Sequence, residues 1–330
     1  NHNVYYNKLM KKKKDKTPIQ PVSGTKVPRF AGPSTFARLP ELRDVESCDV
    51  AIVGVPFDAG TSYRPGARFG PQAIRQASRH LRTNYHPNYD TEPFKDHQFA
   101  DAGDITCNPF NIKEAIEQIQ KGATELLAKV GGIISMGGDH TIALPLLRAV
   151  NHKNKGPVAL VHFDAHLDTW DTYFGAPYTH GTPFRRAREE KLFMEDSSMH
   201  VGIRGPLYSR DDLKNDAEFG FKIIHCDEFQ TEGIDKIVKR IRDKVGNNPL
   251  YLSIDIDVLD PSHAPGTGTP EIAGMTTREM VNVLRGLAGV NLLSADVVEV
   301  SPAYDHAELT SLAAATIIYE LTNLFVRNPD

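Results

Sequence analysis

The sequence of 330 residues is poor in cysteine, and neither sign of charge is in large excess. Its three cysteines, Cys48, Cys107 and Cys226, are far apart and form no C-x-x-C pair. This spacing argues against a disulfide framework or a zinc–thiolate site and favours a reducing, cytoplasmic location. Lysine and arginine number 38 against 42 aspartate and glutamate residues, for a net charge of −4. We therefore expect no binding to nucleic acid or to an acidic membrane surface.

Long hydrophobic runs are also lacking. The apolar stretches are interrupted within about ten residues, well short of the ~20 that span a bilayer, so no membrane span is expected. Hydrophobic residues make up 40% of the chain and charged residues 24%, which is a globular balance that excludes collagen, coiled coil and wholesale disorder. A chain of this length can bury a large core in one domain without disulfides.

Residues 1–27 are polar and contain four consecutive lysines, Lys11 to Lys14. This composition predicts an N-terminal arm that is flexible or lies on a neighbouring subunit. The arm lacks the continuous apolar core or clear amphipathic pattern of a targeting peptide. We assign residues 28–330 to a single folded domain.

From about residue 48 onward, short apolar runs alternate with stretches of helical periodicity. The runs are continuous and rich in Val and Ile, which indicates strands buried on both faces, as in a parallel sheet. They cover residues 50–55, 132–136, 158–163, 199–203, 222–225, 250–256 and 292–300. The helical stretches cover residues 111–129, 234–245 and 276–287, and the last begins with a capping-box pattern. This order predicts a single α/β domain with a doubly wound, mostly parallel sheet flanked by helices.

Acidic and imidazole side chains follow three of these runs, at the sheet edge where the carboxyl ends of parallel strands meet. Residues two apart in an extended segment project to the same side, so they can converge on one point. Six side chains are candidate ligands: His140, Asp164, His166, Asp168, Asp255 and Asp257. His162 lies in the same run, and we interpret it as structural because six ligands already suffice.

These six groups predict a binuclear metal site at the carboxyl ends of the strands. Four converging buried carboxylates need a cation, and carboxylates can bridge two ions. The ligand set is rich in oxygen, contains some nitrogen and has no sulfur. It favours Mn²⁺ first, with Ni²⁺, Co²⁺ or Zn²⁺ as alternatives, because ligand hardness alone does not fix the metal.

The motifs that carry these ligands resemble the three signatures of the ureohydrolases, the arginase and agmatinase enzymes that release urea from guanidino compounds. They are Gly137-Gly138-Asp139-His140, Asp164-Ala165-His166-Leu167-Asp168 and the stretch 253–261 around Asp255 and Asp257. Supporting matches occur at 62–71, 180–184 and 299–302, so the resemblance runs from about residue 50 to residue 310. The opening at 28–36, and Thr169-Trp170 where arginases typically have Asn, are more similar to the agmatinase and guanidino-acid branch.

The resemblance implies roles for eight residues. One metal ion would be held by His140, Asp164, Asp168 and Asp255, and the other by Asp164, His166, Asp255 and Asp257. His180 resembles the family's proton-shuttling histidine, and Glu299 resembles the acid that receives the guanidinium. Asp168 would also hold the attacking hydroxide and accept its proton. The family commonly forms trimers or hexamers, so a homo-oligomer is expected.

The substrate is less well defined by the sequence. Trp170, Asp171 and Tyr173 are candidate substrate-binding residues between Asp168 and His180, although loop anchoring or subunit packing explains the aromatic residues equally well. An acid at the mouth favours a cationic tail, so agmatine is the preferred candidate. Guanidinobutyrate, guanidinopropionate and free guanidine remain open, because Arg185, Arg186 and Arg204 could reach an anionic tail.

Two other classes of function compete with this interpretation. A deacetylase-like amidohydrolase shares this kind of sheet but uses one metal ion, and His140, Asp168 and Asp257 would then be surplus ligands. A non-catalytic subunit of a ureohydrolase complex would be expected to have lost ligands, and this chain retains all of them. The number of metal ions per chain and the activity of the isolated chain distinguish these alternatives.

Overall fold

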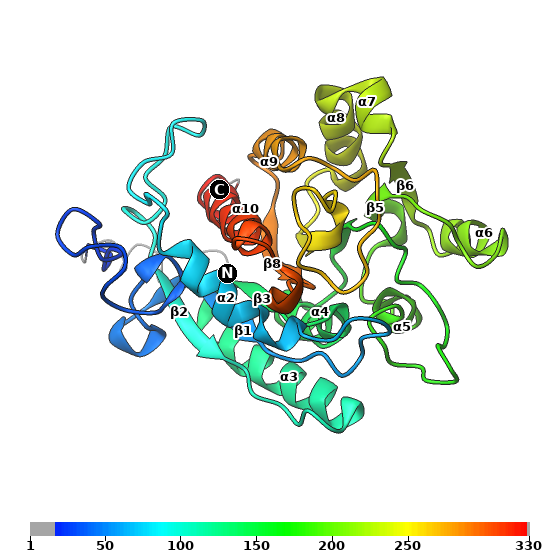
Figure 1. The fold of residues 1–330 in the computed structure, drawn as a ribbon, viewed down its shortest axis with the longest axis horizontal. Coiled ribbons are helices and arrows are strands. Elements are labelled where there is room, and N and C mark those ends of the chain that lie inside the picture. The colour runs from blue at the N-terminus through cyan, green and yellow to red at the C-terminus, as the bar shows by residue number, and fades with distance from the viewer. Residues whose placement is uncertain (1–16, 329–330) are drawn as a thin grey trace, which may run out of the picture.

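The computed structural model describes residues 17–328, and Lys11 to Lys14 of the predicted arm lie outside the described residues. Eight strands in this part of the chain form one sheet in the order β2-β1-β3-β8-β7-β4-β5-β6, and all neighbouring strands are parallel (Figure 1). The strands are β1 (Cys48–Val55), β2 (Phe99–Asp104), β3 (Val130–Gly137), β4 (Ala159–Phe163), β5 (Met199–Ile203), β6 (Lys222–His225), β7 (Leu250–Asp255) and β8 (Leu292–Val298). The predicted single α/β domain with a parallel sheet is confirmed.

Helices cover both faces of the sheet (Figure 1). One layer contains α2 (Gly70–Ser78), α8 (Ile234–Val245), α9 (Thr277–Gly286) and α10 (Leu309–Val326), and the other contains α3 (Ile112–Leu127), α4 (Ala143–Asn154) and α5 (Pro183–Glu189). The shorter α6 (Asp211–Glu218) and α7 (Glu228–Glu232) lie near β5 and β6 (Figure 1). Alternate residues of a strand enter different cores: Val50 and Ile52 pack with the first layer, and Ala51 and Val53 with the second.

Most predicted elements are found within two residues of their expected ends. The capping box at the start of α9 is present, because the Thr276 side chain accepts from the Glu279 backbone and the Glu279 side chain accepts from the Thr276 backbone. Strand β2 was not predicted. Its sequence, Phe-Ala-Asp-Ala-Gly-Asp, contains residues that are depleted in strands, and among the strands described it pairs only with β1, at the edge of the sheet.

Helix α10 is the only helix among residues 17–328 that is long and apolar enough to cross a membrane. In this structure 72% of its apolar window is buried inside the protein. Its buried Glu320 side chain accepts from the Arg285 guanidinium at 2.8 Å and lies 3.1 Å from His86 Nε2. These contacts are those of a core helix in the layer that covers the middle of the sheet.

The described part of the predicted N-terminal arm, residues 17–27, contacts the folded domain of the same chain. The Ile19 backbone donates to the Gln98 side chain at 2.8 Å, just before β2, and Val22 donates to the Arg38 carbonyl at 3.0 Å. A contact between this arm and another subunit stays a prediction.

Candidate active site

The first ligand segment follows β3, where two glycines allow the chain to approach a neighbouring loop closely. A Cβ on Gly138 would lie 2.1 Å from the Phe57 carbonyl oxygen, so only glycine fits. The Asp139 side chain then accepts from the Thr141 backbone and caps the short helical turn His140–Ile142. This turn presents the His140 ring, which is fully buried, to the ends of β4 and β7.

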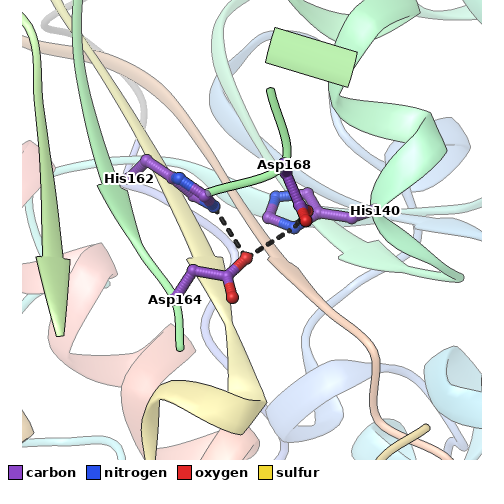
Figure 2. Close-up of side chains that lie close together, drawn as sticks. All are labelled: His140, His162, Asp164 and Asp168. Atoms are coloured by element: carbon purple, nitrogen blue, oxygen red, sulfur yellow. Dashed lines mark hydrogen bonds and ion pairs between the residues drawn. The ribbon is translucent and has the colours of Figure 1, made fainter. Parts of the chain in front are cut away.

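Three carboxylates surround one nitrogen of the His140 ring. His140 Nδ1 lies 3.2 Å from Asp164 Oδ2, 3.0 Å from Asp168 Oδ2 and 3.3 Å from Asp255 Oδ2. Figure 2 shows Asp164 and Asp168 close to this ring. The four residues predicted to hold the first metal ion are therefore brought together.

The other nitrogen of His140 explains how this ring is oriented. The Ser253 hydroxyl donates to Asp296 Oδ1 at 2.8 Å, so its oxygen is free to accept from His140 Nε2, also at 2.8 Å. The Tyr251 hydroxyl donates to the other oxygen of Asp296 at 2.5 Å. A neutral His140 with its proton on Nε2 would direct the Nδ1 lone pair at three carboxylates, and a metal ion or a second proton on Nδ1 relieves this repulsion. The donor set therefore fits a divalent metal ion.

The second ligand cluster shares Asp164 with the first. His166 Nδ1 lies 3.2 Å from Asp164 Oδ1 and 3.1 Å from Asp257 Oδ2. One oxygen of Asp164 thus faces His140 and the other faces His166, which is the arrangement of a carboxylate that bridges two ions. Backbone amides fix the acids: Ala165 donates to Asp257 at 3.1 Å, and Asp257 donates to Asp255 at 2.8 Å.

The pKa shifts of the residues in these two clusters also indicate a site with excess buried negative charge. Burial, reinforced by the neighbouring carboxylates of Asp257 and Asp164, raises the pKa of Asp255 well above its usual range. Burial and Asp164 also raise the pKa of Asp257 to about 6. Against the burial effect, the surrounding carboxylates hold the pKa of His140 well above that of a free imidazole. In the absence of metal, the buried negative charge is thus balanced by added protons.

His162 contributes more than the sequence indicated. Its Nε2 lies 2.8 Å from Asp164 Oδ2, as Figure 2 shows, and its Nδ1 lies 2.7 Å from His200 Nδ1. His200 Nε2 in turn lies 3.0 Å from Asp216 Oδ1, which also accepts from the Thr169 hydroxyl at 3.0 Å. Burial lowers the pKa of His162 to about 3, so the ring is neutral and can donate one hydrogen bond to Asp164. A buried hydrogen-bonded chain therefore supports the bridging carboxylate.

His180 and Glu299 lie together beside these clusters. His180 Nδ1 lies 2.9 Å from Glu299 Oε1, and His180 Nε2 lies 2.6 Å from the Ser62 hydroxyl. Although burial alone would lower it, the Glu299 carboxylate raises the pKa of His180 to about 9. Glu299 is 1% exposed, and its Oε2 has no hydrogen-bond partner within the described chain.

A cavity of about 670 Å³ leads to these residues. Its lining includes His166, Asp168, His180 and Asp255, together with Trp170 and Tyr173, two of the candidate substrate-binding residues between Asp168 and His180. The Trp170 and Tyr173 rings stack with their centroids 5.5 Å apart. The cavity therefore joins the metal ligands to an aromatic wall.

Asp171 is placed differently from the expectation. It does not line this cavity but a smaller neighbouring one of about 390 Å³. Its carboxylate is 63% exposed and lies 2.5 Å from the Arg186 guanidinium. Asp171 is therefore already paired and does not line the cavity next to the ligand clusters, so its position gives no support for a cationic substrate tail.

Fold and site together define an α/β protein with two adjoining clusters of candidate metal ligands at the carboxyl ends of a parallel sheet. A family model described as the Arginase family matches residues 48–323, and the chain belongs to this family. It is accordingly an enzyme, a hydrolase that acts on guanidino groups.

Named relatives cover nearly the whole chain. A Schizosaccharomyces pombe protein whose name places it among the agmatinases is 47% identical, over 91% of this chain and 84% of its own length. Guanidinopropionase from Pseudomonas aeruginosa is 43% identical, over 94% of this chain and 96% of its own. Among solved structures, proclavaminate amidino hydrolase from Streptomyces clavuligerus has a TM-score of 0.87 and 41% identity, covering 92% of this chain and 100% of its own.

Proposed function

We propose that this enzyme hydrolyses the guanidino group of a small linear guanidino compound to urea and an amine, with two divalent metal ions bound per chain. The observation that carries the proposal is the shared Asp164 carboxylate, whose two oxygens face His140 and His166 separately. The remaining predicted ligands, Asp168, Asp255 and Asp257, lie within 3.3 Å of these two rings. Mn²⁺ is the proposed metal because most donors are carboxylate oxygens, and Ni²⁺ is the alternative.

The residues of the chain have separate roles in this reaction. When bound, the metal ions would lower the pKa of a water molecule, so that hydroxide is available near neutral pH to attack the guanidino carbon. Asp168, which lines the cavity, would hold this water by a hydrogen bond and take its proton. Glu299 offers an unpaired, buried Oε2 for the cationic guanidino group. His180, which lines the cavity and touches Glu299, is placed to deliver a proton to the departing amine.

The charged side chains that line the cavity, and not Asp171, are the basis for proposing the chemistry of the substrate tail. With Asp171 paired to Arg186, the cavity offers no unpaired carboxylate for the amine of agmatine beyond the groups at the metal centre and Glu271, among the residues described. The name guanidinopropionase, borne by a relative 43% identical, supports a short guanidino compound that ends in a carboxylate.

The test is urea release by purified protein loaded separately with Mn²⁺ and Ni²⁺. The panel contains agmatine, arginine, 4-guanidinobutyrate, 3-guanidinopropionate and guanidine. Urea from one of these compounds, with two metal ions bound per chain, is the expected result. Protein that binds no metal and releases no urea would overturn the proposal, and a single bound ion would instead favour the deacetylase-like alternative.

We also propose a homo-oligomer, a trimer or hexamer, located in the cytoplasm. The support for a reducing compartment is that the chain has only three cysteines, which are far apart in the sequence and form no C-x-x-C pair. Light scattering of the purified protein tests the assembly, and fractionation of the source cells tests the location.

A further inference from the structure

The cavity in front of the metal ligands carries three charged side chains that the proposed reaction does not use. Of its charged lining residues, His166, Asp168 and Asp255 are candidate metal ligands, and His180 is bonded to Glu299. The other three are Arg64, Arg204 and Glu271. Their pairing decides which charge the cavity offers to the tail of a substrate.

Arg204 and Glu271 are already engaged. The Arg204 guanidinium donates to backbone carbonyls, including those of Asp257 at 2.6 Å and Glu271 at 2.8 Å, so it holds the β7 exit loop in place. The Glu271 carboxylate lies 3.7 Å from His166 Nε2. Glu271 therefore acts as the partner of a metal-binding histidine.

Arg64 differs from both of them. Its guanidinium carbon lies 5.0 Å from the centre of the Tyr304 ring and 5.5 Å from that of Tyr63. Between residues 17 and 328 no acidic side chain lies within ion-pair distance of it, whereas Arg68 in the same segment pairs with Asp58 at 2.5 Å. Aromatic faces orient a guanidinium without neutralising its charge. Arg64 thus presents an uncompensated positive charge at the cavity.

The backbone around Arg64 belongs to the active site. Ser62, two residues earlier, contacts His180 Nε2 through both its hydroxyl and its amide. A Cβ built on Gly268 would lie 3.0 Å from the Arg64 carbonyl oxygen and 3.4 Å from Glu299 Oε2. The Arg64 carbonyl oxygen and the acid proposed for the guanidinium therefore both lie close to Gly268, which brings the backbone of residue 64 near the proposed binding place of the substrate head.

We propose that Arg64 binds the carboxylate of the substrate and that the enzyme is therefore selective for ω-guanidino acids with short tails. The inference rests on the proposed function and adds the residue that would recognise the carboxylate of such a substrate. Arginine is suited to this task because its planar donors match a carboxylate in two parallel hydrogen bonds. The protonated amine of agmatine would instead meet a like charge at the same place.

The test compares three substrates that differ only at the tail: 4-guanidinobutyrate, butylguanidine and agmatine. Wild-type metal-loaded enzyme is expected to show its highest kcat/KM for 4-guanidinobutyrate. In Arg64→Met the ratio of kcat/KM for 4-guanidinobutyrate over butylguanidine falls about 10- to 100-fold, the range for a hydrogen bond to a charged group. Arg64→Lys recovers part of this ratio, and Arg64→Glu shifts the preference toward agmatine. Arg43→Met, which removes a surface arginine paired with Glu41, serves as the matched control and leaves the ratio unchanged.

Calorimetry on metal-free protein separates this inference from the proposed reaction, because no turnover is needed. There 4-guanidinobutyrate is expected to bind more tightly than butylguanidine in the wild type and equally in Arg64→Met. Equal binding of the two ligands to the wild type, or an equal loss for all three substrates in Arg64→Met, would overturn the role of Arg64. Absence of urea from every substrate despite tail-selective binding would contradict the proposed reaction and leave the role of Arg64 supported.

Discussion

Asp168 and Glu299 both have a left-handed backbone, with φ of 54° and 66°, although neither is glycine. This conformation is unfavourable for a residue with a Cβ and persists where the surrounding structure enforces it. The Glu299 amide donates to the Gly138 carbonyl at 2.8 Å, which fixes the chain just where β8 ends. Both proposed catalytic carboxylates are therefore carried by strained backbone.

Glu299→Gln tests the acid proposed for the guanidinium. Loss of the negative charge should weaken substrate binding by about 10- to 100-fold, the range for a hydrogen bond between charged groups, while two metal ions remain bound. Substrate affinity by calorimetry and metal content by elemental analysis are the measurements. Loss of a metal ion in this variant would show that Glu299 is a ligand.

His162→Ala tests the support of the bridging carboxylate. Removal of the hydrogen bond to Asp164 should lower metal affinity by about 10- to 100-fold, as removal of other second-layer partners of metal ligands does. Competition with a chelator measures this affinity. His162→Gln keeps a donor on the side chain and should restore part of the loss, and His152→Ala, at an exposed position of α4, is the control. Unchanged affinity in His162→Ala would make His162 a packing residue only.

At the scale of the elements, the close approach between the β3 exit and the loop after β1 positions both His140 and Glu299. Gly138→Ala would place a Cβ 2.1 Å from the Phe57 carbonyl oxygen and 2.6 Å from that of Val55. We expect a loss of about 1–3 kcal/mol in the free energy of unfolding, together with a loss of activity as Glu299 moves. Denaturant unfolding measures the first quantity. Gly156→Ala, where a Cβ meets nothing within 4 Å, should leave both unchanged.

The strands and the clustering of the candidate metal ligands could be predicted because their signals are local. Runs of Val and Ile define buried strands, and alternate acids and histidines at a strand end converge whatever their neighbours are. The partners of His162 could not be predicted in this way. His200 comes from β5 and Asp216 from α6, so the pairing depends on strand order. Asp171 likewise forms an ion pair with Arg186, 15 residues further along the chain. The preference for agmatine that was based on the sequence did not take this ion pair into account.

For the whole molecule, metal binding and folding are coupled. Because four buried carboxylates converge, removal of the ions by a chelator should lower the melting temperature, and ions at 100 times their dissociation constant contribute about 2.7 kcal/mol for each site. Calorimetry with and without chelator, alongside a count of two ions per chain, provides the measurement. An unchanged melting temperature after the ions have been removed would show that the fold does not depend on them.

The position of β8 in the sheet has a consequence for how the protein is made. Strand β8 lies between β3 and β7, and it separates a group of early strands, β2-β1-β3, from the group β7-β4-β5-β6. During synthesis these two groups have no shared neighbour until residues 292–298 have left the ribosome. His140 belongs to one group, and Asp164, His166 and Asp255 belong to the other, so a nascent chain cannot assemble the complete ligand set beforehand. Sheets joined by such distant segments fold slowly. We therefore expect the ligand set that includes His140 to be completed late in biosynthesis, after β8 has joined the two halves of the sheet, whereas Asp164, His166, Asp255 and Asp257 all belong to one half.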